Sequence, residues 1–135
     1  ISTVANQNTG AELLKVDSVL MQFGGLKALN NVSLSIKRGT IHGLIGPNGS
    51  GKSTIAKLVQ RLYVPEGGRL LIDGVDLAQM DPAWLRRQIG VVLQENFLFR
   101  GTVRENLSAA KPDATFEEIV EAATAAGAAA SGTTV

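Results

Sequence analysis

Apolar residues in the first third of the chain recur with the two-residue period of a β-strand. Residues 13–23 alternate with a break near residues 17–18, and residues 32–36 alternate strictly before a turn. The two segments therefore predict a pair of antiparallel strands. Residues 40–45 form a short apolar run instead, which is typical of a buried parallel strand.

The rest of the chain alternates between helical and strand-like patterns. Apolar residues recur at helical spacing after Lys52, and Asp81 followed by Pro82 is an N-cap with proline at the first helical position. Residues 115–118 form a capping box that opens an alanine-rich helix ending near Gly127. The predicted elements are helices over 52–62, 82–87, 102–109 and 115–127 and strands over 69–73 and 91–93. This order predicts an α/β fold.

Residues 46–53, between the apolar run and the first helix, read Gly-Pro-Asn-Gly-Ser-Gly-Lys-Ser and match the phosphate-binding loop pattern. Its glycines let backbone N–H groups approach an anion, and the helix start adds a favourable dipole. Lys52 is expected to reach the β- and γ-phosphates, Ser53 to ligate Mg²⁺ and Thr54 to contact the α-phosphate. The predicted nucleotide-binding residues of the loop are Gly46, Asn48, Gly49, Ser50, Gly51, Lys52, Ser53 and Thr54. A chance match in a turn is the alternative, but the strand–loop–helix order argues against it.

Composition narrows the classes of partner. The chain has 135 residues, the size of one ordinary domain, and 13 basic against 12 acidic residues give a net charge of +1. No polyanion-binding footprint is visible, so nucleic acid is not expected as the main partner. The chain has no cysteine, which excludes disulfides and thiolate metal sites and fits a reducing compartment. Its apolar stretches are too short for direct membrane insertion, so any membrane role is expected to come through a partner.

Residues 13–127 resemble the ATP-binding subunits of ABC transporters. The resemblance rests on the phosphate-binding loop and on the segments over residues 28–34, 68–74 and 91–95. It implies a P-loop NTPase fold: a partial ABC ATPase core with an N-terminal antiparallel β portion and the start of the helical subdomain. It also implies ATP and Mg²⁺ as ligands, a transmembrane domain and a second nucleotide-binding domain as partners, and a place at the cytoplasmic face of the membrane.

The resemblance assigns two further site residues. Gln94 lies where the family has its Q-loop glutamine, which contacts Mg²⁺ and the attacking water; an ordinary polar residue after a strand is the alternative. Phe23 lies where the family has an aromatic ring that stacks on adenine, and a core role is the alternative. The implied division is a flexible tail over 1–12, a partial ATP-binding core over 13–110, the start of the helical subdomain over 111–127 and a flexible tail over 128–135.

The two halves of the chain resemble different branches of the family. Residues 13–50 are similar to importer ATPases for branched-chain amino acids, and residues 56–127 are similar to ATPases of type I secretion and lipid exporters. These likenesses suggest a hybrid, engineered or recombined, with a seam near residues 50–56. A divergent natural member is the alternative.

The sequence contains no LSGGQ-like signature, no Walker B aspartate followed by glutamate, and no switch histidine. The only histidine, His42, precedes the phosphate-binding loop, and a packed structural role is expected for it. The chain is thus expected to bind nucleotide but to hydrolyse it weakly or not at all alone, as a module truncated before these motifs. One alternative is a non-catalytic fold fragment or engineered chimeric scaffold. Another is a small P-loop phosphotransferase, for which the candidate lid residues are Arg86, Arg87, Arg100 and Arg104.

Overall fold

A computed structural model of the chain describes residues 2–5, 10–93, 95 and 97–127. It consists of two units, Ile1–Val91 and Val92–Val135. The domain bounds predicted from the sequence divide the chain elsewhere and stay a prediction.

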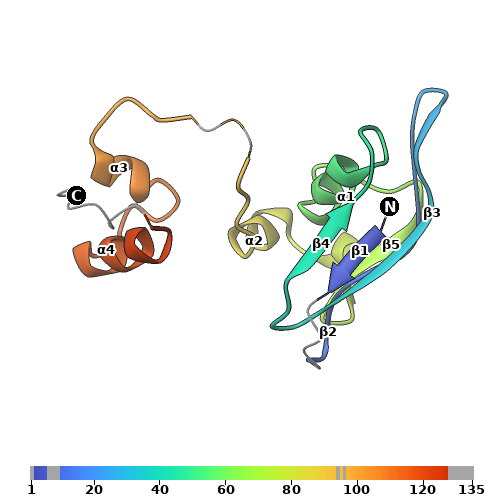
Figure 1. Cartoon of the computed structure of the whole chain (residues 1–135), viewed down its shortest axis with the longest axis horizontal. Helices are drawn as coiled ribbons and strands as arrows, with labels where there is room; N and C mark the ends of the chain where they lie inside the picture. The colour runs from blue at the N-terminus through green and yellow to red at the C-terminus, as the bar shows by residue number, and fades with distance from the viewer. Residues whose placement is uncertain (1, 6–9, 94, 96, 128–135) are drawn as a thin grey trace. The chain divides into compact units, whose positions relative to one another are not determined.

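A four-stranded antiparallel sheet forms the framework of the first unit (Figure 1). Its strands are β2 (Glu12–Phe23), β3 (Leu26–Lys37), β5 (Gly67–Ile72) and β6 (Val75–Asp76), in the order β3-β2-β5-β6. The predicted break in β2 is confirmed, because Ser18 has a φ of 52° and the register with β3 shifts between Val16 and Val19. The backbone N–H of Ser18 donates to Ser33 Oγ at 2.8 Å, so the irregularity keeps a cross-strand hydrogen bond.

A second, two-stranded sheet contains the strand before the phosphate-binding loop. This strand, β4 (His42–Ile45), pairs antiparallel with β1 (Ser2–Ala5). The prediction of a buried parallel strand is therefore wrong in both respects, because β4 pairs antiparallel with its neighbour and Ile45 is 60% exposed. Within the described residues, β1 is the strand that pairs with β4, and this pairing also gives β structure to residues 2–5, where the sequence predicts a tail.

Helix α1 (Lys52–Val59) packs on the four-stranded sheet through its apolar face. Ile55 and Leu58 are buried, as the helical spacing predicts. The helix ends before Leu62, because Arg61 adopts a left-handed φ of 55°, and Leu62 is 52% exposed instead of continuing the buried face. The buried core consists of Val16, Val19, Met21, Leu29, Ile55, Leu58, Leu70, Leu77 and Leu85.

Two short helical segments complete the first unit: the 3-10 helix η1 (Leu77–Gln79) and helix α2 (Pro82–Arg87). The predicted cap of α2 is confirmed, because the Asp81 carboxylate accepts a hydrogen bond from the Trp84 backbone N–H at 2.9 Å. Arg86 on α2 donates to the backbone carbonyls of Gln60 at 3.1 Å and Arg61 at 3.0 Å. These contacts connect α2 to the end of α1.

The strand predicted over residues 91–93 is not formed. These residues lack strand pairing, and Val92 is 93% exposed. An apolar run becomes a strand only where a neighbouring strand accepts its backbone hydrogen bonds, and no described strand does so here.

The second unit contains α3 (Val103–Leu107) and α4 (Phe116–Ala125), each opened by a complete capping box. Hydrogen bonds from the backbone and side chain of Thr102 hold the pKa of Glu105 below its ordinary value. In the second box, a hydrogen bond from Lys111 is the main cause that lowers the pKa of Glu118, at 2.8 Å between Nζ and Oε1. Both predicted helix starts are confirmed, as is the end of α4, where Gly127 has a φ of 78°.

We expect Leu58→Ala to lower the free energy of unfolding by about 2–5 kcal/mol, because a leucine that is 1% exposed leaves a cavity when it is truncated. Leu62→Ala is the matched control: the same change one turn later, at a side chain that is 52% exposed, should cost well under half as much. Urea unfolding of both variants measures the difference. Similar losses would contradict the placement of the end of α1.

Candidate nucleotide-binding site

The loop between β4 and α1 is shaped by two glycines in left-handed conformations, Gly49 with a φ of 83° and Gly51 with a φ of 94°. A Cβ at Gly51 would lie 2.4 Å from Leu29 Cδ2 and 2.8 Å from the Ala28 carbonyl oxygen. Gly51 therefore has to be glycine for steric as well as conformational reasons. Its close approach holds the loop against β3.

The start of α1 has backbone donors without a capping acceptor. Gly51 is the N-cap residue, it has no side chain to accept from the first helical N–H groups, and the first turn contains no acidic residue. The first N–H groups of a helix have no partner within the helix, and the helix dipole makes this end favourable for an anion. The start of α1 can therefore hold a phosphate group.

Lys52 keeps its ammonium group on the loop. Its Nζ donates to the carbonyl oxygen of Gly46 and, at 3.2 Å, to that of Pro47. These acceptors are neutral, whereas phosphate oxygens are charged and form stronger hydrogen bonds with an ammonium group. Lys52 can therefore exchange its hydrogen bonds to the loop carbonyls for hydrogen bonds to a bound anion.

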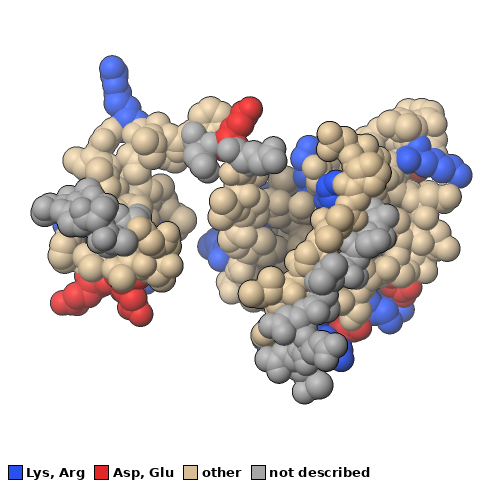
Figure 2. Space-filling view, viewed as in Figure 1, with Lys and Arg blue, Asp and Glu red and all other residues tan. Residues whose placement is uncertain are grey.

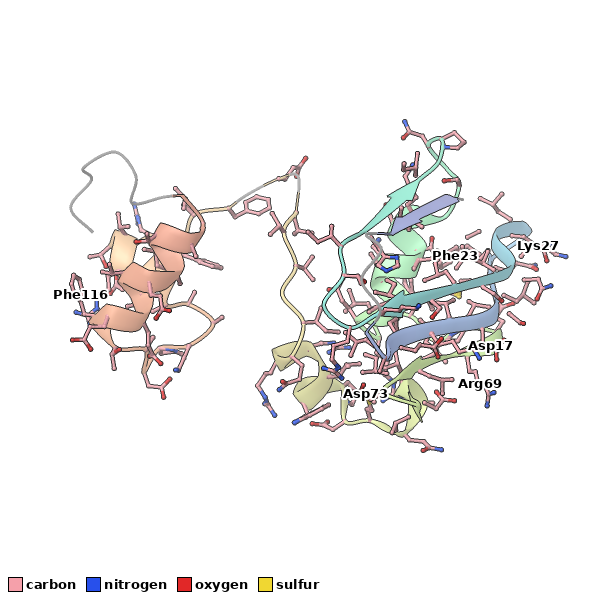
Figure 3. All side chains as sticks on the ribbon, turned by 60° about the horizontal axis from the view of Figure 1, so that its bottom comes forward. Asp17, Phe23, Lys27, Arg69, Asp73 and Phe116 are labelled. Atoms are coloured by element: carbon pink, nitrogen blue, oxygen red, sulfur yellow. The ribbon has the colours of Figure 1, made fainter. Side chains whose placement is uncertain are left out.

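The loop and the end of the β2–β3 hairpin enclose an open cavity of about 320 Å³. Phe23, the last residue of β2, and Lys27, near the start of β3, lie at the same end of this hairpin (Figure 3). Lys27 and Lys52 are the charged side chains that line the cavity, and no described carboxylate lines it. The cavity is lined by Phe23, Leu26, Lys27, Ala28, Pro47, Asn48, Gly49, Ser50, Gly51, Lys52, Ser53 and Thr54. It combines positive charge, backbone donors and one aromatic ring.

The structure brings together most of the residues that the sequence proposes for the site. All predicted loop residues except Gly46 line the cavity, and the Gly46 carbonyl holds Lys52. Phe23 also lines it and is 41% exposed, which disfavours a purely core role. Gln94 lies outside the described residues. Ser53 is the loop hydroxyl proposed for Mg²⁺, and the described residues include no cluster of three or more carboxylate or histidine ligands.

Sequence reasoning missed the hairpin residues Leu26, Lys27 and Ala28. The signal was available, because Gly24 and Gly25 mark a hairpin turn after Phe23. That turn places Leu26 opposite Phe23 and Lys27 opposite Gln22, as the observed register confirms. What the sequence did not reveal is that this end of the hairpin faces the phosphate-binding loop.

His42 and Ser50 carry polar atoms that lie inside the first unit. Both ring nitrogens of His42 and the Ser50 hydroxyl are buried without a hydrogen-bond partner among the described residues. The buried ring agrees with the packed position expected for His42. Ser50 differs because the residue also lines the cavity.

Comparison with known proteins identifies the family. The family model described as "ABC transporter" matches residues 29–133. The chain therefore belongs to the ABC transporter family and contains part of its ATP-binding domain. The structure of a bacterial Atm1-family ABC exporter with ATP bound is similar to the chain, with a TM-score of 0.79 and 32% sequence identity, over 93% of this chain and 23% of the exporter chain. The antiparallel sheet and helices described above thus form part of a P-loop NTPase core.

Curated relatives are named as toxin translocation ATP-binding proteins. The chain is 56% identical over 100 residues to the leukotoxin translocation ATP-binding protein LktB of Mannheimia glucosida. It is 54% identical over 100 residues to the alpha-hemolysin translocation ATP-binding protein HlyB of Escherichia coli. Each match covers 74% of this chain and 14% of the relative, so the chain spans about a seventh of the length of these proteins.

These matches bear on the two halves of the chain. A match over 100 of 135 residues includes residues 50–56 wherever it begins. Similarity to the secretion branch, predicted for the second half, therefore continues across the proposed seam. The importer-like origin of the first half stays a prediction.

We expect Gly51→Ala to abolish Mg-ATP binding, because the added Cβ meets Leu29 and the Ala28 carbonyl within 2.8 Å. Gly39→Ala is the control: its φ of 74° is also left-handed, but nothing lies within 4 Å of the added Cβ and the residue does not line the cavity. That variant should lose only about 1–2 kcal/mol of stability and retain binding. Titration with Mg-ATP alongside urea unfolding distinguishes the two, and normal ATP affinity in Gly51→Ala would contradict the loop geometry.

Proposed function

We propose that the chain binds Mg-ATP in the cavity between the phosphate-binding loop and the hairpin end. The observation that carries the proposal is the uncapped start of α1 beside Lys52, in a cavity lined by lysines and no described carboxylate. Polyphosphate is the ligand that this arrangement suits best. Lys52 would hold the β- and γ-phosphates, Thr54 the α-phosphate, and Phe23 the adenine ring.

We assign the Mg²⁺ position to Ser53 and, by family resemblance, to Gln94. The Ser53 hydroxyl belongs to the first turn of α1 and lines the cavity. Mg²⁺ is usually bound by few protein groups together with phosphates and water, so the lack of a carboxylate cluster among the described residues does not oppose this assignment. When bound, Mg²⁺ would neutralise phosphate charge.

We further propose that the isolated chain turns ATP over weakly or not at all. The sequence lacks the family's signature, the glutamate that follows a Walker B aspartate, and the switch histidine. Asp73 is a possible substitute base, but it pairs with Arg38 at 2.6 Å and does not line the cavity. A positioned base typically contributes 10²–10⁴-fold, which would be missing here.

Two alternatives to the proposed function can be distinguished from it by experiment. In a small phosphotransferase, arginines would have to close over the phosphates, but Arg86 already holds the carbonyl groups at the end of α1. Phosphoryl transfer to a small acceptor would support that alternative. In a non-catalytic fragment or engineered chimeric scaffold, the loop would be vestigial, and the absence of nucleotide binding would support it.

The partners of the chain are proposed from its family. We propose a transmembrane domain and a second nucleotide-binding domain as partners and the cytoplasmic face of the membrane as the location. No described helix is long and apolar enough to cross a bilayer. Basic and acidic side chains are both scattered over the described surface visible in Figure 2, which agrees with a near-zero net charge and disfavours nucleic acid as a partner.

Mg-ATP should stabilise the protein by about 2.7 kcal/mol at a concentration a hundredfold above its dissociation constant. Lys52→Ala should remove most of this shift, because the ammonium group next to the loop is lost. Lys37→Ala removes the same charge at the end of β3, outside the cavity, and should retain the shift. Thermal unfolding with and without Mg-ATP tests this, and a full shift in Lys52→Ala would place the nucleotide elsewhere.

ATP turnover by the isolated chain should be at or barely above background, because no described residue is placed as a general base in the cavity. Gln94→Ala should then make little further difference. Phosphate release under saturating Mg-ATP measures the rate. Turnover of about 1 s⁻¹ that disappears in Lys52→Ala would overturn the proposal and point to Asp73 or Glu95 as the base.

A further inference from the structure

Phe23 is held by a second aromatic ring that does not itself line the cavity. The rings of Phe23 and Tyr63 meet edge to face, with centroids 5.1 Å apart and an angle of 66° between their planes. Tyr63 is absent from the cavity lining and packs against the buried core. Phe23 therefore contacts Tyr63 while also lining the cavity.

The sheet brings these rings together from positions forty residues apart in the sequence. Phe23 ends β2, and Tyr63 lies in the connection from α1 to β5, the strand that pairs with β2. The backbone N–H of Glu66 donates to the Leu20 carbonyl at 2.9 Å, which fixes this connection beside the last residues of β2. The contact thus follows from strand pairing.

A lysine on α1 adds a third member to this cluster. Lys57 Nζ lies 5.5 Å from the centroid of the Tyr63 ring, within the range of a cation–π interaction. Lys57 follows Thr54, a cavity residue, by three positions on the same helix, so both lie on neighbouring parts of its surface. The helix whose start lines the cavity therefore also contacts the ring that packs against Phe23.

We propose that Tyr63, oriented by Lys57, is a positioning residue that fixes the Phe23 ring for stacking on the nucleotide base. This inference rests on the proposed binding of ATP and on the assignment of Phe23 to adenine. An exposed ring at the end of a strand can adopt several rotamers, and an edge-to-face partner on one side reduces that freedom before a base arrives. Tyr63 should consequently affect affinity for the base and leave affinity for the phosphates unchanged.

The test compares Mg-ATP with magnesium tripolyphosphate, which has the phosphates and no base. Tyr63→Leu should weaken ATP binding by about 2- to 10-fold, in line with the strength of an edge-to-face aromatic pair, and leave tripolyphosphate binding unchanged. Tyr63→Phe retains the ring and should bind both ligands normally. Lys57→Met should cause a smaller loss for ATP alone, with Lys37→Met as the matched charge control.

The results of these variants distinguish a failure of this inference from a failure of the proposed function. Phe23→Ala should weaken ATP and spare tripolyphosphate; if it weakens neither, the adenine assignment fails and the role of Tyr63 fails with it. If Phe23→Ala weakens ATP but Tyr63→Leu does not, only the positioning role is overturned. Equal losses for both ligands in Tyr63→Leu would make Tyr63 a structural support of the whole site, and a loss in Tyr63→Phe would assign the effect to the hydroxyl group. If Tyr63→Leu does not fold, Lys57→Met decides: no ATP-specific loss would overturn the inference.

Discussion

The packing of α1 on the antiparallel sheet is the constraint on which the candidate site depends. Ile55 and Leu58 are buried against residues of β2, β3 and β5, so the rotation of the helix about its axis is fixed. Because this helix begins at Lys52, fixing its rotation also fixes the position and direction of the uncapped N–H groups in its first turn. Gly51 then sets how closely the loop approaches β3. Burial of one helix face, and not any contact within the loop alone, places the phosphate-binding donors opposite the hairpin end.

The two sides of the cavity are built in different ways. The phosphate side comes from one continuous stretch, residues 46–54, whose backbone geometry and helix start are local properties. The proposed base side comes from the end of the β2–β3 hairpin. Its ring, Phe23, meets Tyr63 behind the cavity lining only because β2 pairs with β5. Under the proposed binding mode, affinity for phosphates and affinity for a base should therefore respond to different mutations.

The proposed function separates nucleotide binding from hydrolysis, because the two processes need different groups. The family model covers most of the chain, but the chain covers only 14% of its secretion relatives. Binding a polyphosphate requires preformed donors and positive charge, which a loop and one helix can supply. Hydrolysis also requires a positioned base and charge stabilisation around the attacking water, and these groups come from several segments. A chain with the first set can recognise nucleotide without the second.

Local chemistry accounts for what the sequence predicted correctly. The caps of α2, α3 and α4 and the break in β2 are confirmed, because each depends on residues close together in the chain. Pattern reasoning failed for β4 and residues 91–93, where an apolar run indicates burial but not which strand pairs with it.

The sequence by itself determined the phosphate-binding loop, its strand–loop–helix setting and the family, since glycine, lysine and serine at fixed spacing have few other uses. Only the tertiary structure decided that Lys27 and Phe23 share a cavity with this loop, and that Tyr63 contacts Phe23. The reason is physical: periodicity specifies which face of an element is buried, whereas contacts between distant segments are set by strand pairing and by how side chains fill the space between helix and sheet.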